Sequence, residues 1–262
     1  MKNIFNKLLY VLAIGVFFLS CEENAIPELT VPVNEESTFV KFFFHAEDAP
    51  EANFYLDDKK ITGVNTDEEE VEGLDFGGVY PTNAYALVPS GNFEMRAVDI
   101  DMNEVAFTQA SFEQGENYSV YLVGTSENYE VAVLEDNLPA DHPQNIYWRF
   151  VHTMANLPFE VDAYAVRAAV PETENSPAEE AQVIELGNSI GFTEGGEYQL
   201  LEPGRYDFKI FESGSEYDPV ESTPFIQHSV TVGTRGRAYT TQIRGTYSEE
   251  TTSGKIDFWR DR

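Results

Sequence analysis

The sequence predicts an all-β fold of two tandem antiparallel β-sandwich domains, which follow a signal peptide and a short tether. Three observations support this prediction. Short aromatic and β-branched runs alternate with turns containing Pro, Gly and Asn, at the spacing of a sandwich. Several of these runs recur 107 to 121 residues further along the chain. No stretch shows the sustained apolar period of about 3.6 residues that an amphipathic helix requires.

The composition excludes several classes of protein. Asp and Glu number 46 against 16 Lys and Arg, which gives a formal net charge of −30. Nucleic acids and anionic membrane surfaces are bound through clustered Lys and Arg, so we expect neither as a partner of the folded part. A hydrophobic content of 42%, with 19 Phe and 14 Tyr, is too high for a disordered acidic coil. The chain therefore has enough apolar residues to build folded domains.

Residues 1–20 have the pattern of an export signal. Lys2 and Lys7 precede an apolar run over residues 8–19. A helix of this length rises about 18 Å, against about 30 Å of membrane hydrocarbon. The run is therefore too short for a comfortable span and typical of a secretory signal. Cys21, the only cysteine of the chain, follows it directly, so no disulfide framework can form.

The segment Phe18-Leu-Ser-Cys21 resembles the lipobox of bacterial lipoproteins, although lipoboxes prefer Leu where this chain has Phe18. The resemblance implies that Cys21 is lipidated and attaches the protein to a membrane through its acyl chains. We expect an exported protein anchored at the outer membrane, and the sequence leaves periplasmic and outer-face display open. An ordinary signal peptide or a short uncleaved anchor is the alternative. Residues 21–37 contain two Pro, five Glu and no aromatic residue, so they are predicted to form a tether.

Two copies of one β unit follow the tether. Three pairs of segments align: His45 and His152, 85–93 and 198–206, and 115–118 and 236–239. Their offsets grow from 107 to 113 to 121 residues, so insertions lie between the strands and not within them. The predicted domains are residues 38–137 and 145–262, each of ordinary domain size.

Strands are expected wherever a short aromatic or β-branched run ends at a turn. In the first copy these runs are 39–44, 52–56, 84–88, 93–98, 105–112 and 118–123. In the second copy they are 148–152, 161–166, 198–201, 206–211, 225–232 and 238–244, with a last edge strand at 255–259. Pro89-Ser-Gly91 and its counterpart Glu202-Pro-Gly204 have the residues of tight turns.

Residues 42–55, followed by the hairpin from Tyr85 to Gly91, resemble the domain-of-unknown-function family 4397. The second copy resembles it through the segments 149–152 and 158–164. The first copy departs from the family pattern at Ala46-Glu47, where members carry Ser-Pro. The resemblance implies immunoglobulin-like sandwiches in secreted and lipid-anchored bacterial proteins, without known catalytic residues.

One motif points to catalysis. Gly187-Asn-Ser189-Ile-Gly191 satisfies the G-x-S-x-G pattern, in which a hydrolase serine occupies a sharp turn between a strand and a helix. Here no helix is predicted, and His228 is the sole later histidine. We therefore expect a Gly-rich β turn and no enzyme, and a hydrolase using Ser189 is the least favoured alternative.

Two sets of residues have features of metal ligands. His45 and His152 occupy equivalent places, but no zinc-binding spacing accompanies them. We expect each to bond the turn after its strand, far from the other. Asp99, Asp101 and Asn103 alternate as calcium ligands do, but the Gly at position six and the Glu at position twelve of an EF-hand are missing. A solvated hairpin loop is favoured, so no cofactor is expected and Ca²⁺ stays an alternative.

These expectations together describe a lipid-anchored cell-envelope protein that is a non-catalytic binding or structural surface module. Its expected partners are the membrane, through lipidated Cys21, and an extracellular polysaccharide or another envelope protein. The alternative is an accessory glycan- or protein-binding subunit of an outer-membrane uptake system.

Overall fold

The computed structural model describes residues 37–62, 73–126, 128–172, 174, 177–178, 180–248 and 254–262. Every regular element in these residues is a β-strand, which confirms the all-β prediction. Within the same ranges, no helix is long and apolar enough to cross a membrane. The predicted signal peptide, Cys21 and the tether up to residue 36 lie outside the described residues.

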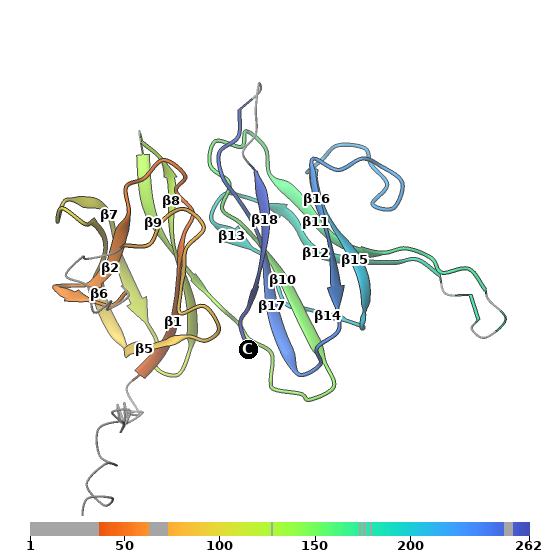
Figure 1. Ribbon diagram of the computed structural model, residues 1–262, viewed down its shortest axis with the longest axis horizontal. Helices are drawn as coiled ribbons and strands as arrows, with labels where there is room; N and C mark the ends of the chain where they lie inside the picture. The colour runs from red at the N-terminus through yellow and green to blue at the C-terminus, as the bar shows by residue number, and fades with distance from the viewer. Residues whose placement is uncertain are drawn as a thin grey trace, which may run out of the picture. The chain divides into compact units, whose positions relative to one another are not determined.

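In the described residues between 37 and 135, nine strands form the first sandwich (Figure 1). They are β1 (Ser37–Phe44), β2 (Ala52–Leu56), β3 (Lys59–Lys60), β4 (Val79–Tyr80), β5 (Ala86–Pro89), β6 (Gly91–Asp99), β7 (Glu104–Phe112), β8 (Asn117–Thr125) and β9 (Asn128–Glu135). One sheet has the order β4-β1-β8-β9, with β5 also beside β1, and the other has the order β3-β2-β6-β7.

Nine further strands between residues 146 and 260 form the second sandwich. They are β10 (Ile146–His152), β11 (Val161–Arg167), β12 (Gln182–Ile190), β13 (Glu194–Gly195), β14 (Gln199–Leu201), β15 (Gly204–Glu212), β16 (Ile226–Val232), β17 (Arg237–Arg244) and β18 (Lys255–Arg260). The sheet orders β13-β10-β17-β18, with β14 beside β10, and β12-β11-β15-β16 repeat those of the first sandwich.

Strand pairing is antiparallel with one exception in each sandwich. β1 runs parallel to β8, with Phe42 opposite Val120, and β10 runs parallel to β17, with Phe150 opposite Thr241. In the first sandwich, β1 has β4 and β5 on one side and β8 on the other. In the second, β10 has β13 and β14 on one side and β17 on the other. The aromatic and β-branched runs predict where strands lie but not this direction, because parallel and antiparallel pairing show the same alternation of side chains.

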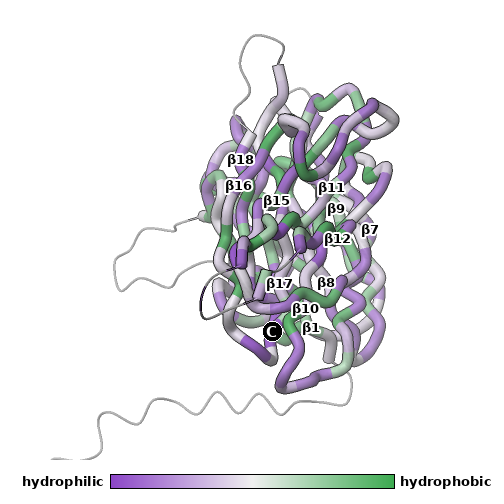
Figure 2. The backbone as a smooth tube through the Cα atoms, turned by 90° about the vertical axis from the view of Figure 1, so that its right-hand side faces the viewer, coloured by the Kyte–Doolittle hydropathy of each residue, from purple (hydrophilic) through white to green (hydrophobic). Residues whose placement is uncertain are grey.

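Each sandwich has its own apolar core, which the alternation of side chains explains. In β1, Val40, Phe42 and Phe44 point into the first core, and Lys41 and Phe43 point to the opposite face of the sheet. The second core is built the same way around residues such as Trp148, Phe150, Tyr206 and Phe208. Figure 2 shows apolar and polar residues interspersed along the strands, as half-buried sheets require.

A third apolar cluster joins the two sandwiches. Phe43, Val79, Tyr121 and Val123 of the first sandwich pack with Val151 of the second, and Trp259 packs against them. The outer faces of the sheets β4-β1-β8-β9 and β13-β10-β17-β18 therefore meet. Residues Glu35–Arg262 form one compact unit. The division into independent domains at residues 137 and 145 stays a prediction.

Two of the longer strands differ from the sequence prediction. β9 was not predicted, because its alternating Val131 and Val133 lie among charged residues. β12 was not predicted either, and the Gly187–Ile190 segment expected to be a turn is its last part. Its pairing with β11 shifts register around Ala163, so a β-bulge replaces the turn. The predicted strand at 255–259 is confirmed as β18, at the edge of its sheet.

Candidate functional site

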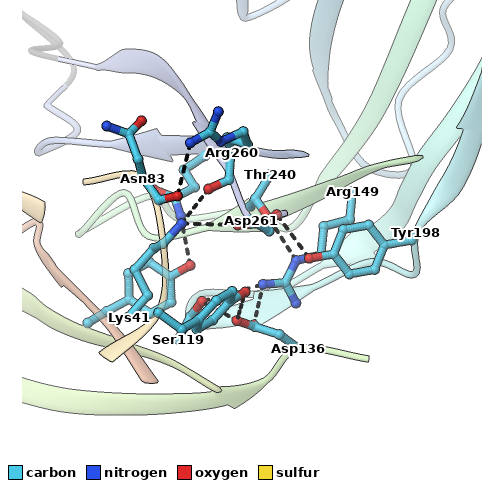
Figure 3. Close-up of polar contacts among 12 residues, drawn as sticks. Lys41, Asn83, Ser119, Asp136, Arg149, Tyr198, Thr240, Arg260 and Asp261 are labelled. Atoms are coloured by element: carbon cyan, nitrogen blue, oxygen red, sulfur yellow. Dashed lines mark hydrogen bonds and ion pairs between the residues drawn. The ribbon is translucent and has the colours of Figure 1, made fainter. Parts of the chain in front are cut away.

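The contact between the sandwiches contains buried charged groups, which we call the interface network (Figure 3). Its members are two cations, two carboxylates, two small hydroxyls and two tyrosines: Lys41, Arg149, Asp136, Asp261, Ser119, Thr240, Tyr85 and Tyr198. The side chains of the four charged residues are at most 4% exposed. Buried charges are retained in proteins only when they are paired and hydrogen-bonded.

One half of the network is centred on Asp136, which follows β9. Arg149 of β10 forms an ion pair with its Oδ1, and the arrangement is fully buried. Ser119 Oγ and Tyr85 Oη donate to its other oxygen at 2.7 and 2.8 Å. The guanidinium of Arg149 also lies 4.9 Å from the centre of the Tyr198 ring.

The other half is centred on Asp261, which follows β18. Lys41 Nζ of β1 lies 3.8 Å from Asp261 Oδ1 and donates to the Arg260 carbonyl at 2.5 Å. Thr240 Oγ1 and Tyr198 Oη donate to Asp261 Oδ2 at 2.6 and 3.0 Å. In each half, the cation belongs to one sandwich and the carboxylate to the other, so neither sandwich alone neutralises its own cation through these pairs.

The electrostatics of the network follow from burial. Burial lowers the pKa of Lys41, against the opposing effect of the Asp261 and Asp136 carboxylates. Burial raises the pKa of Asp261, against the effect of Arg149 and Lys41. Burial alone would lower the pKa of Arg149, but Asp136 raises it well above its usual range. Burial disfavours the charged forms of Lys41 and Asp261, and the opposite charges from the other sandwich counteract it.

Sequence reasoning missed this network. The available signal was a single charged residue inside each of two apolar strands, Lys41 in STFVKFFF and Arg149 in IYWRFVH. On a strand whose inner face is apolar, such a residue must lie on the outer face. The sequence does not show that this outer face is buried as well.

The histidine prediction was wrong for His45. Its Nδ1 lies 2.7 Å from Thr153 Oγ1 in the second sandwich, and the ring is buried against Tyr121. The residue next to His152 is therefore in contact with His45, although the two histidines were expected to lie far apart. His152 does bond its following turn, because its Nδ1 accepts from the Met154 amide at 3.2 Å.

The predicted metal ligands make local bonds. Asp99 accepts from the amide and the side chain of Asn103, at 2.7 and 2.9 Å, across the exposed turn between β6 and β7. Asp101 is exposed in the same turn. In the described part of the chain, no three His, Cys, Asp or Glu side chains are grouped so that they could hold a metal ion.

A shallow hollow of about 620 Å³ lies on the second sandwich, beside the loop between β15 and β16. Its walls include Asp162, Tyr164, Asn188, Ser189, Ser213 and Tyr217, and we call it the tyrosine hollow. Tyr217 stacks on Phe211 of β15 with ring centres 4.3 Å apart. Lys209 holds the same loop by donating to the carbonyls of Pro219 and Val220, at 2.9 and 2.8 Å.

Polar groups in the tyrosine hollow form a connected chain. Asp162 is buried and accepts from Tyr217 Oη at 2.5 Å and from the Ser189 amide at 2.7 Å. Tyr164 Oη lies 3.0 Å from Tyr217 Oη, and Ser189 Oγ lies 2.7 Å from Ser213 Oγ. Ser189 has φ +51°, a left-handed conformation that a non-glycine residue adopts only when its surroundings impose it.

The geometry around Ser189 is not that of a hydrolase. Ser189 lies one residue before the end of β12, one edge strand of its sheet, and His228 lies on β16, the opposite edge. Two strands separate them, a distance of roughly 14 Å at about 4.8 Å per strand. The His228 ring lies against Phe258. A nucleophile and its base must lie within hydrogen-bond reach, so this pair cannot serve.

We predict that Asp136→Asn lowers the free energy of unfolding by about 3–5 kcal/mol, because it leaves the Arg149 charge buried without its partner. Urea denaturation measures the loss. Asp141→Asn is the matched control, because the Asp141–Arg262 pair spans 3.8 Å and the Asp141 side chain is 76% exposed. That change should cost about 0–1 kcal/mol. Equal losses in the two variants would show that the buried pair has no special role.

We also predict that acid destabilises the fold through His45. Burial, with a smaller effect from Arg244, lowers its pKa to about 3 from the ordinary 6.5. Between these pH values the unfolded state binds more protons than the folded state, so stability falls as pH falls, by about 1.4 kcal/mol per unit. His45→Gln removes this proton uptake and should reduce the slope of the melting temperature between pH 6.5 and 4, leaving the part due to His152, whose pKa burial lowers to about 4.

The control for this experiment is His142→Gln, because His142 is exposed in the segment between β9 and β10. Its profile should follow that of the parent chain. Only the slopes of melting temperature against pH are compared, because either substitution can shift the stability at neutral pH. Parallel profiles for all three proteins would contradict the assignment to His45.

Several solved structures are similar to this chain. CBMbc (family CBM26) from Eubacterium rectale Amy13K, solved with maltoheptaose, has 11% identity and a TM-score of 0.24, covering 86% of this chain and 97% of its own. A putative cell adhesion protein from Bacteroides ovatus ATCC 8483 has 8% identity and a TM-score of 0.25, covering 87% and 98%. Likenesses at this level carry no argument about function. No curated protein matches the chain.

A family comparison is more specific. Residues 38–164 match the family described as Domain of unknown function (DUF4397). The matched segment contains the whole first sandwich and continues through β10 into β11 of the second. The resemblance inferred from the sequence is therefore confirmed over these residues, as a likeness to the DUF4397 family.

Proposed function

We propose that this protein is a non-catalytic binding module of the cell envelope, held at the membrane through lipidated Cys21. The observation that carries the binding role is the tyrosine hollow. Its volume of about 620 Å³ lies within the range of small-ligand sites, about 300–1,000 Å³. The anchor rests on the lipobox-like segment alone, and we place the protein at the outer membrane on that basis.

The chemistry of the hollow favours a polyhydroxylated ligand such as a segment of polysaccharide. Aromatic rings offer an apolar surface to the C–H groups of such a ligand, and polar groups fix its hydroxyls. Tyr217 supplies the ring, with the buried Tyr164 behind it, and Asn188, Ser189 and the carboxylate of Glu216 supply hydrogen-bonding groups. The ligand would meet an already connected set of side chains, which limits the ordering cost of binding.

The same hollow is the strongest argument against an enzyme. Ser189 Oγ is next to another serine, and the buried Asp162 is bonded by a tyrosine and a backbone amide. Neither arrangement activates a nucleophile. We therefore assign the left-handed Ser189 to shaping the wall of a binding surface, where its amide holds Asp162.

We predict that Tyr217→Ala weakens glycan binding at least tenfold, a change of about 1.4 kcal/mol, because it removes a wall of the hollow. A glycan array identifies the ligand, and titration calorimetry with that glycan gives the affinity. Tyr55→Ala is the control, because Tyr55 lies on β2 of the other sandwich. Equal glycan affinity of the two variants would show that the tyrosine hollow is not the binding site. An esterase activity lost in Ser189→Ala would establish a hydrolase instead.

A separate prediction concerns the anchor. Cells grown with labelled palmitate should label the parent protein and not Cys21→Ala, because the chain has no other cysteine to lipidate. Protease treatment of intact cells then distinguishes outer-face display, which gives cleavage, from periplasmic retention. Equal labelling of both proteins would overturn the lipid anchor and leave the binding role untouched.

A further inference from the structure

Backbone hydrogen bonds show which residues of the two sandwiches are equivalent. The His45 amide donates to Leu122 O at 2.8 Å, and the Thr153 amide donates to Ile243 O at 2.9 Å. Leu122 and Ile243 are related by the same offset of 121 residues as the segments 115–118 and 236–239. The structural counterpart of His45 is therefore Thr153, and the alignment of His45 with His152 was wrong by one residue.

The same reasoning defines the other equivalent pairs. The Asp136 amide donates to Asn117 O at 2.7 Å, and the Asp261 amide donates to Ala238 O at 2.8 Å. Counting back along the paired strands from His45 and Thr153 gives the remaining pairs. They are Lys41 with Arg149, Phe43 with Val151, and Tyr121 with Gln242.

Equivalent residues meet each other across the interface. His45 Nδ1 lies 2.7 Å from its counterpart Thr153 Oγ1. Gln242 Nε2 donates to its counterpart Tyr121 Oη at 2.8 Å. Phe43 packs in one cluster with its counterpart Val151. A position contacts its own equivalent only on or near a two-fold axis, which is the signature of an isologous contact.

The charged residues away from these positions are arranged reciprocally. Lys41 is paired with Asp261, and its counterpart Arg149 is paired with Asp136, the counterpart of Asp261. Each carboxylate accepts from equivalent donors, Ser119 and Tyr85 in one half and Thr240 and Tyr198 in the other. The contact between the sandwiches thus has the organisation of a two-fold homodimer within one chain.

We propose that each of these sheet faces is a self-recognition surface whose partner is the complementary sandwich, in its own chain or in a second copy of this chain. The segment 136–145 joins β9 to β10 and gives the covalent link. A link of about ten residues holds the two faces at an effective concentration near the millimolar range. The closed monomer therefore dominates, and two chains exchange sandwiches when closure within each chain is blocked.

The test uses two charge-reversed proteins. One carries Lys41→Asp with Asp136→Lys, and the other carries Arg149→Asp with Asp261→Lys. In each protein both ion pairs within the chain become repulsive. In a mixture, the first sandwich of one protein is complementary to the second sandwich of the other, and the two remaining faces are unchanged. Exchange between the chains satisfies all four pairs.

We expect each protein alone to have a lowered melting temperature, because both ion pairs within its chain are repulsive. Their equimolar mixture should give a 1:1 dimer of twice the 29.5 kDa chain mass by light scattering. A chain carrying all four substitutions should be monomeric with its melting temperature largely recovered, because the reversed charges then pair internally. A mixture that stays monomeric while the four-substitution chain recovers would overturn recognition between chains.

A second measurement keeps the proposal testable if the reversed charges prevent folding. In a Cys21→Ser background the chain has no cysteine. His45→Cys in one protein and Thr153→Cys in another place single thiols at contacting positions, so any disulfide must join two chains. We expect a cross-linked heterodimer after the two are unfolded and refolded together at millimolar concentration, where exchange competes with closure within the chain, and none when Ser215→Cys replaces Thr153→Cys. Absence of the heterodimer would overturn the proposal.

Discussion

Two buried cations and two buried carboxylates lie between the central sheets, and each cation meets a carboxylate of the other sandwich. Removing either sandwich would leave a lysine or an arginine on an apolar face without its counter-charge. The flanking Phe43, Tyr121 and Trp259 would lose their cover at the same time. This reciprocal pairing explains why residues Glu35–Arg262 form one compact unit although they contain two separate cores.

The interface also decides which surfaces remain for a ligand. One sheet of each sandwich is used in the contact, so the opposite sheets and their loops remain for the proposed ligand. On the second sandwich, Lys209 holds the loop between β15 and β16 against its sheet, and Tyr217 stacks on Phe211. Like Lys41 and Arg149, Lys209 is a cation on the outer face of its strand, but its partners are the backbone carbonyls of the loop. The tyrosine hollow lies at the edge of this covered face.

Much of the fold could be predicted because local patterns specify strands. Aromatic and β-branched runs bounded by turn residues located most of the long strands, and the repeated offset indicated two similar units. β9 and β12 were missed, the first among charged residues and the second because its glycines and Ser189 suggested a turn. A bulge kept that segment in the sheet, and bulges depend on the partner strand and not on local composition.

The candidate sites were less predictable than the strands. Ser189 and Asp162 were both visible in the sequence, but their contact depends on the left-handed turn at the end of β12. The interface network was invisible for a similar reason, since a single lysine or arginine in a strand normally indicates a solvated face. His45 shows the limit most clearly, because an alignment error of one residue reverses the face on which a strand side chain lies.

The sequence by itself determined the all-β class, the repeated unit, the acidic composition and the lipobox-like segment at Cys21. These are properties of residue type and spacing over short stretches. Only the tertiary structure decided that the outer faces of two sheets are buried against each other and that equivalent residues meet there. Those contacts join residues between 13 positions apart, as in Asp136 and Arg149, and 219 positions apart, as in Lys41 and Arg260. Their geometry depends on how both sandwiches pack, and no local pattern encodes it.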